Sequence, residues 1–217
     1  MNHRKLDQLI ETGYDFDIRE AFENGWNMFR TYPAYSAGFT FFVIFLQLFF
    51  LVYLSDYALL FGVFLAAPLT AGYFLAANKI TQGNLLIYPD FFKGFQYYVP
   101  LIVVNLLGQI LVAVGLIALV IPGIYLLVCY LFSSLMVLFG GFEFWQALEN
   151  SRKLIQVKWF KFFVFGLFAV LLNILGALFF LVGLAITMPV TYFAIYYIFE
   201  QVTREVFVEG VEESQVG

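Results

Sequence analysis

The sequence YSAGFTFFVIFLQLFFLVYL, residues 35–54, is a run of 20 residues that contains no charged side chain. A helix needs about 20 mainly apolar residues to cross the ~30 Å hydrocarbon core of a bilayer. This run therefore predicts a transmembrane helix, and it is followed by further runs of the same character. They cover residues 59–77, 98–119, 122–139, 160–182 and 184–199. The pattern predicts an all-α polytopic membrane protein in which six transmembrane helices form three hairpins.

The composition of the chain excludes several classes of protein. Hydrophobic residues make up 63% of the 217 residues and charged residues only 12%, whereas about a quarter of a typical soluble domain is charged. So few charges cannot cover a globule in water, which excludes a soluble enzyme and a disordered chain. The formal net charge of −4 argues against nucleic acid as a partner.

Lysine and arginine residues lie outside the six spans or at their edges, in the segments that lead into spans one, three and five or follow span six. Six crossings place these segments on one face of the membrane, and cytoplasmic loops carry the excess of Lys and Arg. We therefore expect both termini in the cytoplasm, with a polar tail at 1–15, a single membrane domain at 16–202 and an acidic tail at 203–217. Acidic residues precede the first apolar run, so we expect no cleaved signal peptide.

Two segments outside the spans, 16–30 and 142–158, repeat apolar residues at helical spacing. In the first, Phe22 and Trp26 are four residues apart on the apolar face. Residues 90–95 are a shorter candidate of the same kind. The pattern predicts amphipathic helices that either lie in the membrane interface or pack on the end of the helix bundle.

An offset of 126 residues aligns the first amphipathic segment with the second, and the similarity continues into the spans. The related groups at this offset or at one of 121 are Glu23-Asn24 with Glu149-Asn150, Gln47 with Asn173, and Pro68-Leu69-Thr70 with Pro189-Val190-Thr191. They predict an internal repeat in which spans one and two are equivalent to spans five and six. Chance similarity between phenylalanine-rich helices is the alternative.

Side chains for catalysis or metal binding are scarce. The single histidine, His3, lies in the polar N-terminal segment, and the single cysteine, Cys129, lies in an apolar run. Zinc and non-haem iron sites draw on several histidine or cysteine ligands, and the carboxylates of this chain lie outside the spans. We therefore expect no catalytic residue, no metal and no cofactor.

A small set of neutral polar residues lies near the middle of the spans. Its members are Gln47, Thr70, Asn105, Gln109, Asn173 and Thr191. They either line a groove for a headgroup or small solute, or hydrogen-bond the helices to one another. Pro68 and Pro189 also fall near the middle of their spans, where proline removes a backbone donor and bends a helix. The two bends serve either gating or helix shape.

Basic residues gather around two tryptophans between spans four and five. The cluster consists of Arg152, Lys153, Lys158, Lys161, Trp145 and Trp159. Lysine and arginine near a membrane surface attract anionic lipid headgroups, and tryptophan favours the membrane interface. The cluster is therefore a candidate lipid-headgroup site, and the alternative is that its charges only set the orientation of the chain.

Short motifs surround this cluster: Pro122-Gly123-Ile124-Tyr125, Ala147-Leu148-Glu149-Asn150-Ser151 and Lys158-Trp159. Over about residues 62–197 the chain resembles a group of six-span bacterial membrane proteins. The group includes the membrane domain fused to some glycerophosphodiester phosphodiesterases and its uncharacterised stand-alone relatives. The resemblance implies an integral protein of the bacterial inner membrane with no assigned catalytic residues. In the fused proteins the phosphodiesterase activity belongs to a separate soluble domain, which these 217 residues do not contain.

Three functions stay open at this point. The first is a non-catalytic membrane protein that binds or organises phospholipid, which the amphipathic segments, the basic cluster and the resemblance all favour. The second is a subunit of a larger membrane or transport complex, with another membrane protein or further copies of the chain as its partner. The third is a facilitator for a small neutral solute that uses the mid-membrane amides.

Overall fold

The computed structural model describes residues 2–207, which form helices joined by short turns, with no strand among them. Within this range six helical segments are long and apolar enough to cross a membrane, so the prediction of an all-α polytopic protein is confirmed. The segments are Pro33–Tyr53, Phe61–Thr81, Tyr88–Ala118, Val120–Leu138, Trp159–Leu178 and Val182–Arg204. They contain the helices α3 (Pro33–Tyr53), η2 with α5 (Phe61–Leu65 and Ala66–Thr81), α6 (Tyr98–Ala118), α7 with α8 (Val120–Cys129 and Ser133–Leu138), α10 (Trp159–Leu178) and most of α11 (Phe180–Phe207), and the short helix α4 (Ala58–Leu60) precedes the second segment.

Further helices lie before or between the helices of these spans. They are α1 (Asn2–Thr12), α2 (Ile18–Thr31), the short turn η1 (Ser55–Tyr57), the 3-10 segment η3 (Tyr88–Tyr97) and α9 (Phe144–Gln156). The stretch expected to be a polar tail contains helix α1. This helix packs on α11 and buries Leu6 there. Helix α11 continues into the expected acidic tail, of which residues 208–217 lie outside the described part of the chain.

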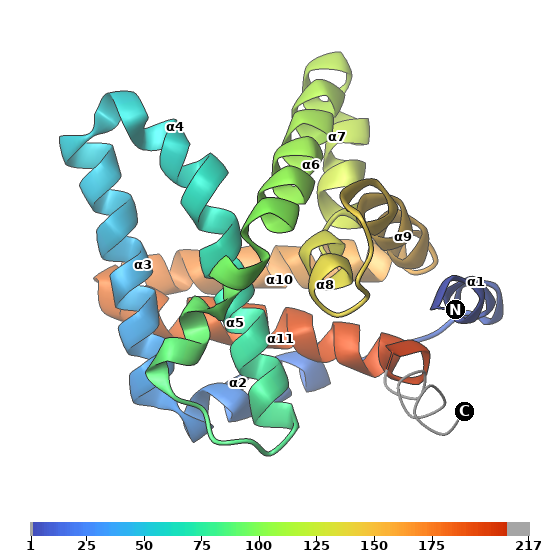
Figure 1. Cartoon of the computed structure of the whole chain (residues 1–217), viewed down its shortest axis with the longest axis horizontal. Coiled ribbons are helices and arrows are strands. Elements are labelled where there is room, and N and C mark those ends of the chain that lie inside the picture. Colours follow the sequence, from blue (N-terminus) through green and yellow to red (C-terminus); the bar gives the residue numbers. More distant parts are fainter. Residues whose placement is uncertain (1, 208–217) are drawn as a thin grey trace.

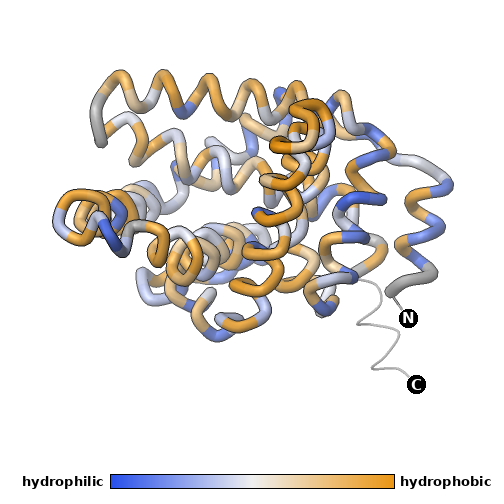
Figure 2. Tube along the Cα trace, turned by 90° about the horizontal axis from the view of Figure 1, so that it is seen from above, coloured by the Kyte–Doolittle hydropathy of each residue, from blue (hydrophilic) through white to orange (hydrophobic). Residues whose placement is uncertain are grey.

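Each of the three hairpins has a peripheral helix and a central helix. The apolar stretches of the central helices α5, α7–α8 and α11 are 56%, 44% and 50% buried, whereas those of the peripheral helices α3, α6 and α10 are only 28%, 17% and 22% buried. The hairpin tips lie away from α1 and α9 (Figure 1). Hydrophilic residues concentrate toward the side that holds α1, while the tips are mainly hydrophobic (Figure 2). The peripheral helices therefore present most of the apolar surface.

The central helices pack on one another through aromatic side chains. Tyr73 of α5 stacks on Tyr192 of α11 with ring centroids 4.9 Å apart. Phe139, directly after α8, packs on Tyr196 of α11 at 5.5 Å. The Tyr196 hydroxyl also donates to Asn78 Oδ1 of α5 at 2.9 Å. Since aromatic side chains bury about 150–250 Å² each, these contacts supply much of the core.

The amphipathic segments link the three hairpins into a closed cycle. Segment η3 leads into the second hairpin and packs on the central helix α5 of the first. Helix α9 leads into the third hairpin and packs on α7 and α8 of the second. Helix α2 leads into the first hairpin and packs on α11 of the third. Each segment thus holds its own hairpin against the preceding one, and the first segment closes the cycle on the last span.

Two of these three contacts are made by glycines that touch backbone. A Cβ added to Gly25 of α2 would lie 2.6 Å from the Val190 carbonyl oxygen of α11. A Cβ added to Gly94 of η3 would lie 2.0 Å from the Pro68 carbonyl oxygen of α5. Such distances leave no room for any side chain, so glycine is required where the amphipathic segment crosses the central helix.

Ser151 of α9 makes the third contact and accounts for a break in span four. The sequence predicts a continuous span at 122–139, but the helix is interrupted at residues 130–132, between α7 and α8. Ser151 Oγ donates to the Cys129 carbonyl at 2.6 Å and accepts from the Phe132 N–H at 3.2 Å. Buried backbone groups need hydrogen-bond partners, and the serine supplies them at the break.

The apolar faces of α2 and α9 are directed at the protein. Helix α2 buries Met28 and Phe29, and α9 buries Leu154 and Ile155. Packing on the end of the bundle therefore accounts for these parts of each apolar face. Trp26 of α2 and Phe144 and Trp145 of α9 stay exposed, at 43%, 43% and 60% of their surfaces.

Pro68 and Pro189 lie inside their helices, as the sequence predicts. Pro68 follows the π-helical turn η2, and Pro189 lies within α11. Two residues after each proline, Thr70 and Thr191 donate from the side chain to the carbonyl oxygen four residues earlier, at 2.7 and 2.8 Å. Each proline therefore removes one backbone hydrogen bond from its helix, and a threonine hydroxyl close by adds a side-chain hydrogen bond.

Replacement of Gly94 by alanine should destabilise the fold, because the new Cβ would force η3 away from α5. Overpacking of this kind costs about 1–3 kcal/mol, and thermal unfolding of the purified protein in detergent measures the loss. Gly166→Ala is the matched control, since a Cβ there meets nothing within 4 Å. Equal unfolding temperatures for Gly94→Ala and the unmodified chain would contradict the close contact.

Candidate functional site

The structure divides the predicted basic cluster into two separate groups. On α9, Arg152 makes a bidentate pair with Glu149, with N···O distances of 2.7 and 2.9 Å, and a further bond of 3.1 Å to Gln156. Lys153 lies 3.9 Å from the same carboxylate. The hydrogen bond from Arg152 lowers the pKa of Glu149. Much of the positive charge expected on α9 is therefore compensated within the helix.

The two tryptophans of the cluster have different surroundings. Trp159 donates from Nε1 to the Tyr125 carbonyl at 3.3 Å, and its ring stacks between Tyr125 and Phe163 at 6.0 and 5.3 Å. It therefore joins α10 to α7. Trp145, in contrast, projects from the first turn of α9 and is largely exposed.

The second basic group lies at the start of α10, next to the turn that precedes α2. Lys161 Nζ is 2.7 Å from Asp15 Oδ1 and 5.2 Å from the centre of the Phe16 ring. Lys158, which is exposed, also acts on Asp15 through its charge. The hydrogen bond from Lys161 is the main cause of a lowered pKa at Asp15. Two cations thus share one carboxylate here, as Arg152 and Lys153 share Glu149 on α9.

A cleft of about 440 Å³ opens beside this group, between the first turns of α2 and α10. It is lined by Asp17, Ile18, Arg19, Phe22, Lys161 and Phe168. Its charged residues come from the first turn of each helix. Phe168 lies seven residues after Lys161 on the same face of α10, about 10 Å further along the helix axis. The cleft therefore has charged residues at one end and aromatic side chains at the other.

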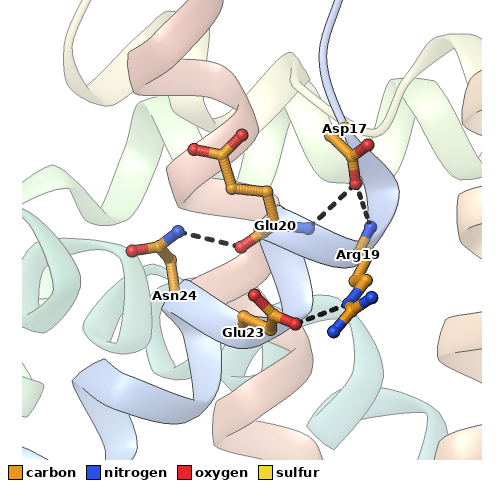
Figure 3. Close-up of polar contacts among 5 residues, drawn as sticks. All are labelled: Asp17, Arg19, Glu20, Glu23 and Asn24. Atoms are coloured by element: carbon orange, nitrogen blue, oxygen red, sulfur yellow. Dashed lines mark hydrogen bonds and ion pairs between the residues drawn. The ribbon is translucent and has the colours of Figure 1, made fainter.

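The start of α2 holds Arg19, which lines the charged end of the cleft. Figure 3 shows the hydrogen bonds of this turn. Asp17 is the N-cap of the helix, and its Oδ1 accepts from the backbone N–H groups of Arg19 and Glu20 at 2.7 and 3.0 Å. This cap satisfies two amides that would otherwise lack partners. The Arg19 side chain bonds Glu23 at 2.7 Å and is 87% exposed.

Two further bonds fix the opposite face of this turn. The Asn24 side chain donates to the Glu20 carbonyl at 2.9 Å (Figure 3). The Tyr197 hydroxyl of α11 donates to Glu20 Oε1 at 2.6 Å. On the cleft side, the Phe22 ring stacks on Phe165 of α10 with centroids 5.0 Å apart. The first turns of α2 are therefore attached to both α10 and α11, so the cleft has defined walls.

The predicted mid-membrane polar residues lie in separate places. Asn105 Nδ2 of α6 donates to Ser134 Oγ of α8 at 3.2 Å, and Gln109 Nε2 reaches Asn105 Oδ1 at 3.5 Å. Both amides line a hollow of about 290 Å³ between α6 and α7–α8. Asn173 Nδ2 of α10 donates to Thr191 Oγ1 of α11 at 2.8 Å, and both residues line another hollow of about 390 Å³.

The remaining two members of that set lie in the first hairpin. Thr70 bonds the Ala66 carbonyl of its own helix, and Gln47 is exposed on α3. Asn105 and Asn173 thus bridge helices as well as line hollows, while Gln47 does neither among the described contacts.

Sequence reasoning missed several residues that shape the site. Asp15, Asp17 and Arg19 were not predicted, although an aspartate directly before an amphipathic helix is a recognisable N-cap signal. Asp90 was also missed: it is 2% exposed, with Lys79 Nζ at 2.6 Å and Lys93 Nζ at 2.8 Å. The pair with Lys79 fastens η3 to α5, and the pair with Lys93 lies within η3. In the part of the chain that the structure describes, no group of three or more His, Cys, Asp or Glu could hold a metal ion.

In comparisons with known proteins, no family model, no curated protein and no solved structure matches this chain.

Proposed function

We propose that this protein is a non-catalytic integral membrane protein that binds phospholipid in the cleft between α2 and α10. The observation that carries the proposal is the arrangement within the cleft. Lys161 and Arg19 line its charged end together with the capping carboxylate Asp17, and Phe22 and Phe168 line its apolar end. A phospholipid has the same two parts in the same order, with an anionic phosphate followed by acyl chains.

Each end of the cleft suits one part of the lipid. Lysine and arginine form strong charge-assisted hydrogen bonds with phosphate oxygens, and each adds about 1 kcal/mol of attraction to an anionic membrane surface. The aromatic side chains at the other end carry no charge and can pack against the acyl chains. Because the cleft lies where α10 enters the apolar span, a lipid can occupy it without leaving the bilayer.

The orientation proposed for the chain agrees with this site. Lysine and arginine gather in the segments that hold α1, α2, η3 and α9, which the positive-inside rule assigns to the cytoplasm. We therefore place both termini and the cleft on the cytoplasmic face of a bacterial inner membrane. The closed cycle of three hairpins supports the proposed internal repeat, with each unit made of one amphipathic segment and one hairpin.

A second candidate function, a subunit of a larger membrane complex, is favoured by one observation. Helix α9 presents Phe144 and Trp145 outward, 43% and 60% exposed, next to one another at its first turn. Aromatic residues of this kind are enriched at the centre of protein interfaces. A partner protein that copurifies at a fixed ratio, and is lost on Trp145→Ala, would support this candidate.

Lys161→Gln combined with Arg19→Gln should weaken the retention of phosphatidylglycerol. At about 1 kcal/mol for each cation, the loss amounts to about thirtyfold in affinity. Native mass spectrometry of the protein released from mild detergent counts the lipids that stay bound.

The matched control is Lys153→Gln with Arg30→Gln, which removes the same charge from exposed positions outside the cleft. This control should retain the lipid. Equal losses in both double variants would mean that overall charge, and not the cleft, holds the lipid.

Asp15→Asn should strengthen the retention of the same lipid. Asp15 competes with the lipid phosphate for Lys161, so its removal frees the cation and should raise affinity several-fold in the same experiment. Asp7→Asn, an equal change of charge on the exposed side of α1, should leave retention unchanged. A weaker interaction in Asp15→Asn would show that the carboxylate positions Lys161 for the lipid instead of competing with it.

A further inference from the structure

The charged end of the cleft between α2 and α10 carries both signs of charge. Its lining includes the carboxylate of Asp17 as well as the cations of Arg19 and Lys161. Lys161 pairs with Asp15 at 2.7 Å. Arg19 pairs with Glu23, also at 2.7 Å. Both cations of the lining are therefore matched by a carboxylate before any ligand binds, and Asp17 adds a further negative charge.

Asp17 keeps one oxygen free for a ligand. Its Oδ1 caps α2 by accepting from the N–H groups of Arg19 and Glu20 at 2.7 and 3.0 Å, and Figure 3 shows both bonds at this one oxygen. Its Oδ2 has no hydrogen bond with any residue that the structure describes. Arg19 bonds Glu23 through Nε, which leaves its Nη groups for a ligand. The charge of Asp17 acts on Arg19, so a free carboxylate oxygen and a guanidinium lie close together.

A headgroup that carries only a negative charge fits this end incompletely. The exposed Lys158 also acts on Asp15, so the charges here are balanced, three cations against three carboxylates. A lipid phosphate competes with Asp15 for Lys161, and it brings a second negative charge toward Asp17. Like charges placed together in this way select against a ligand.

A headgroup that carries a phosphate and an ammonium group matches both signs of charge. Its phosphate can accept from Lys161 and from the Nη groups of Arg19, and its ammonium can donate to Asp17 Oδ2. The ammonium also returns a cation to this end when the phosphate draws Lys161 away from Asp15. In ethanolamine a short ethylene link keeps the two charged groups close to one another, as Asp17 and Arg19 are close on α2.

The cleft also favours one form of the ammonium group. A primary ammonium has three N–H donors and suits carboxylate acceptors. A quaternary ammonium has no N–H donor and is recognised by aromatic faces. The aromatic rings that line the cleft, Phe22 and Phe168, lie at its apolar end, and Phe22 is stacked on Phe165. The charged end therefore suits ethanolamine better than choline.

We propose that the cleft selects a phospholipid whose headgroup carries a primary ammonium, as in phosphatidylethanolamine, and that Asp17 Oδ2 accepts the hydrogen bond of that ammonium. This inference rests on the phospholipid cleft proposed above and adds the choice of headgroup to it. Phosphatidylglycerol binds the same cleft through its phosphate, but with lower affinity, because its headgroup offers Asp17 hydroxyl groups and no positive charge.

Competition between lipids with identical acyl chains tests the proposal. The protein in mild detergent is mixed with equal amounts of phosphatidylethanolamine, phosphatidylglycerol and phosphatidylcholine, and native mass spectrometry counts each lipid that stays bound. We expect phosphatidylethanolamine to exceed each of the other two about threefold, the effect of one exposed ion pair. Phosphatidylcholine or phosphatidylglycerol retained as well as phosphatidylethanolamine would overturn the proposal.

Asp17→Asn removes the charge and keeps the cap, since asparagine caps a helix as well as aspartate does. In this variant the preference for phosphatidylethanolamine over phosphatidylglycerol should disappear. Glu143→Gln is the matched control, because Glu143 is an exposed residue at the N-cap position of α9 whose side chain makes no cap bond. The control should keep the threefold preference. A preference that survives in Asp17→Asn would show that another group selects the headgroup, against the proposal.

The double variant Lys161→Gln with Arg19→Gln separates this inference from the one on which it rests. If the cleft binds phospholipid, this variant should retain less of all three lipids. Unchanged retention of every lipid would overturn the cleft itself. Lower retention in the double variant, together with no preference among the three lipids in the unmodified protein, would support the cleft and overturn only the choice of headgroup.

Discussion

Close contact between an amphipathic segment and a central helix is the constraint on which the rest of the structure depends. At Gly25 and Gly94 the backbones touch, and at Ser151 a hydroxyl enters the backbone of span four. Apolar burial between spans gives little direction inside a membrane, because lipid is as apolar as the helices. The contacts at the membrane surface therefore decide which hairpin lies beside which. The ion pairs of Asp90 and the Thr40–Tyr73 bond then follow from that order.

The same arrangement determines which charges are available. Arg152 and Lys153 share Glu149 on α9, whereas Lys158 and Lys161 share Asp15, which precedes α2. A row of cations that is continuous in the sequence is therefore divided between two carboxylates in the fold. Because α2 packs on α11 and its Phe22 reaches α10, the second group borders a cleft with apolar walls. The cleft is in this sense a product of the cycle of hairpins.

Much of the fold follows from the sequence, because crossing a membrane imposes a length and an apolar character on each helix. The expected span 35–54 lies at Pro33–Tyr53, and the amphipathic segment 142–158 holds α9. Pairings between distant residues do not follow, since hydropathy and periodicity describe each segment alone. Asp15 and Lys161 are 146 residues apart, and the type of each residue does not indicate which residue it pairs with. The break in span four depends on Ser151 in the same way, so an apolar run predicted one helix where there are two.

The closed cycle also bears on the order in which the protein is made. The contact between Gly25 and Val190 joins the first amphipathic helix to the last span, so α2 leaves the ribosome long before its partner exists. Segments η3 and α9, by contrast, are made directly after the helices on which they pack. Bringing distant parts of a chain together costs entropy that local contacts avoid. Assembly can thus proceed hairpin by hairpin during synthesis. Helix α2 can dock only after the sixth span has been made.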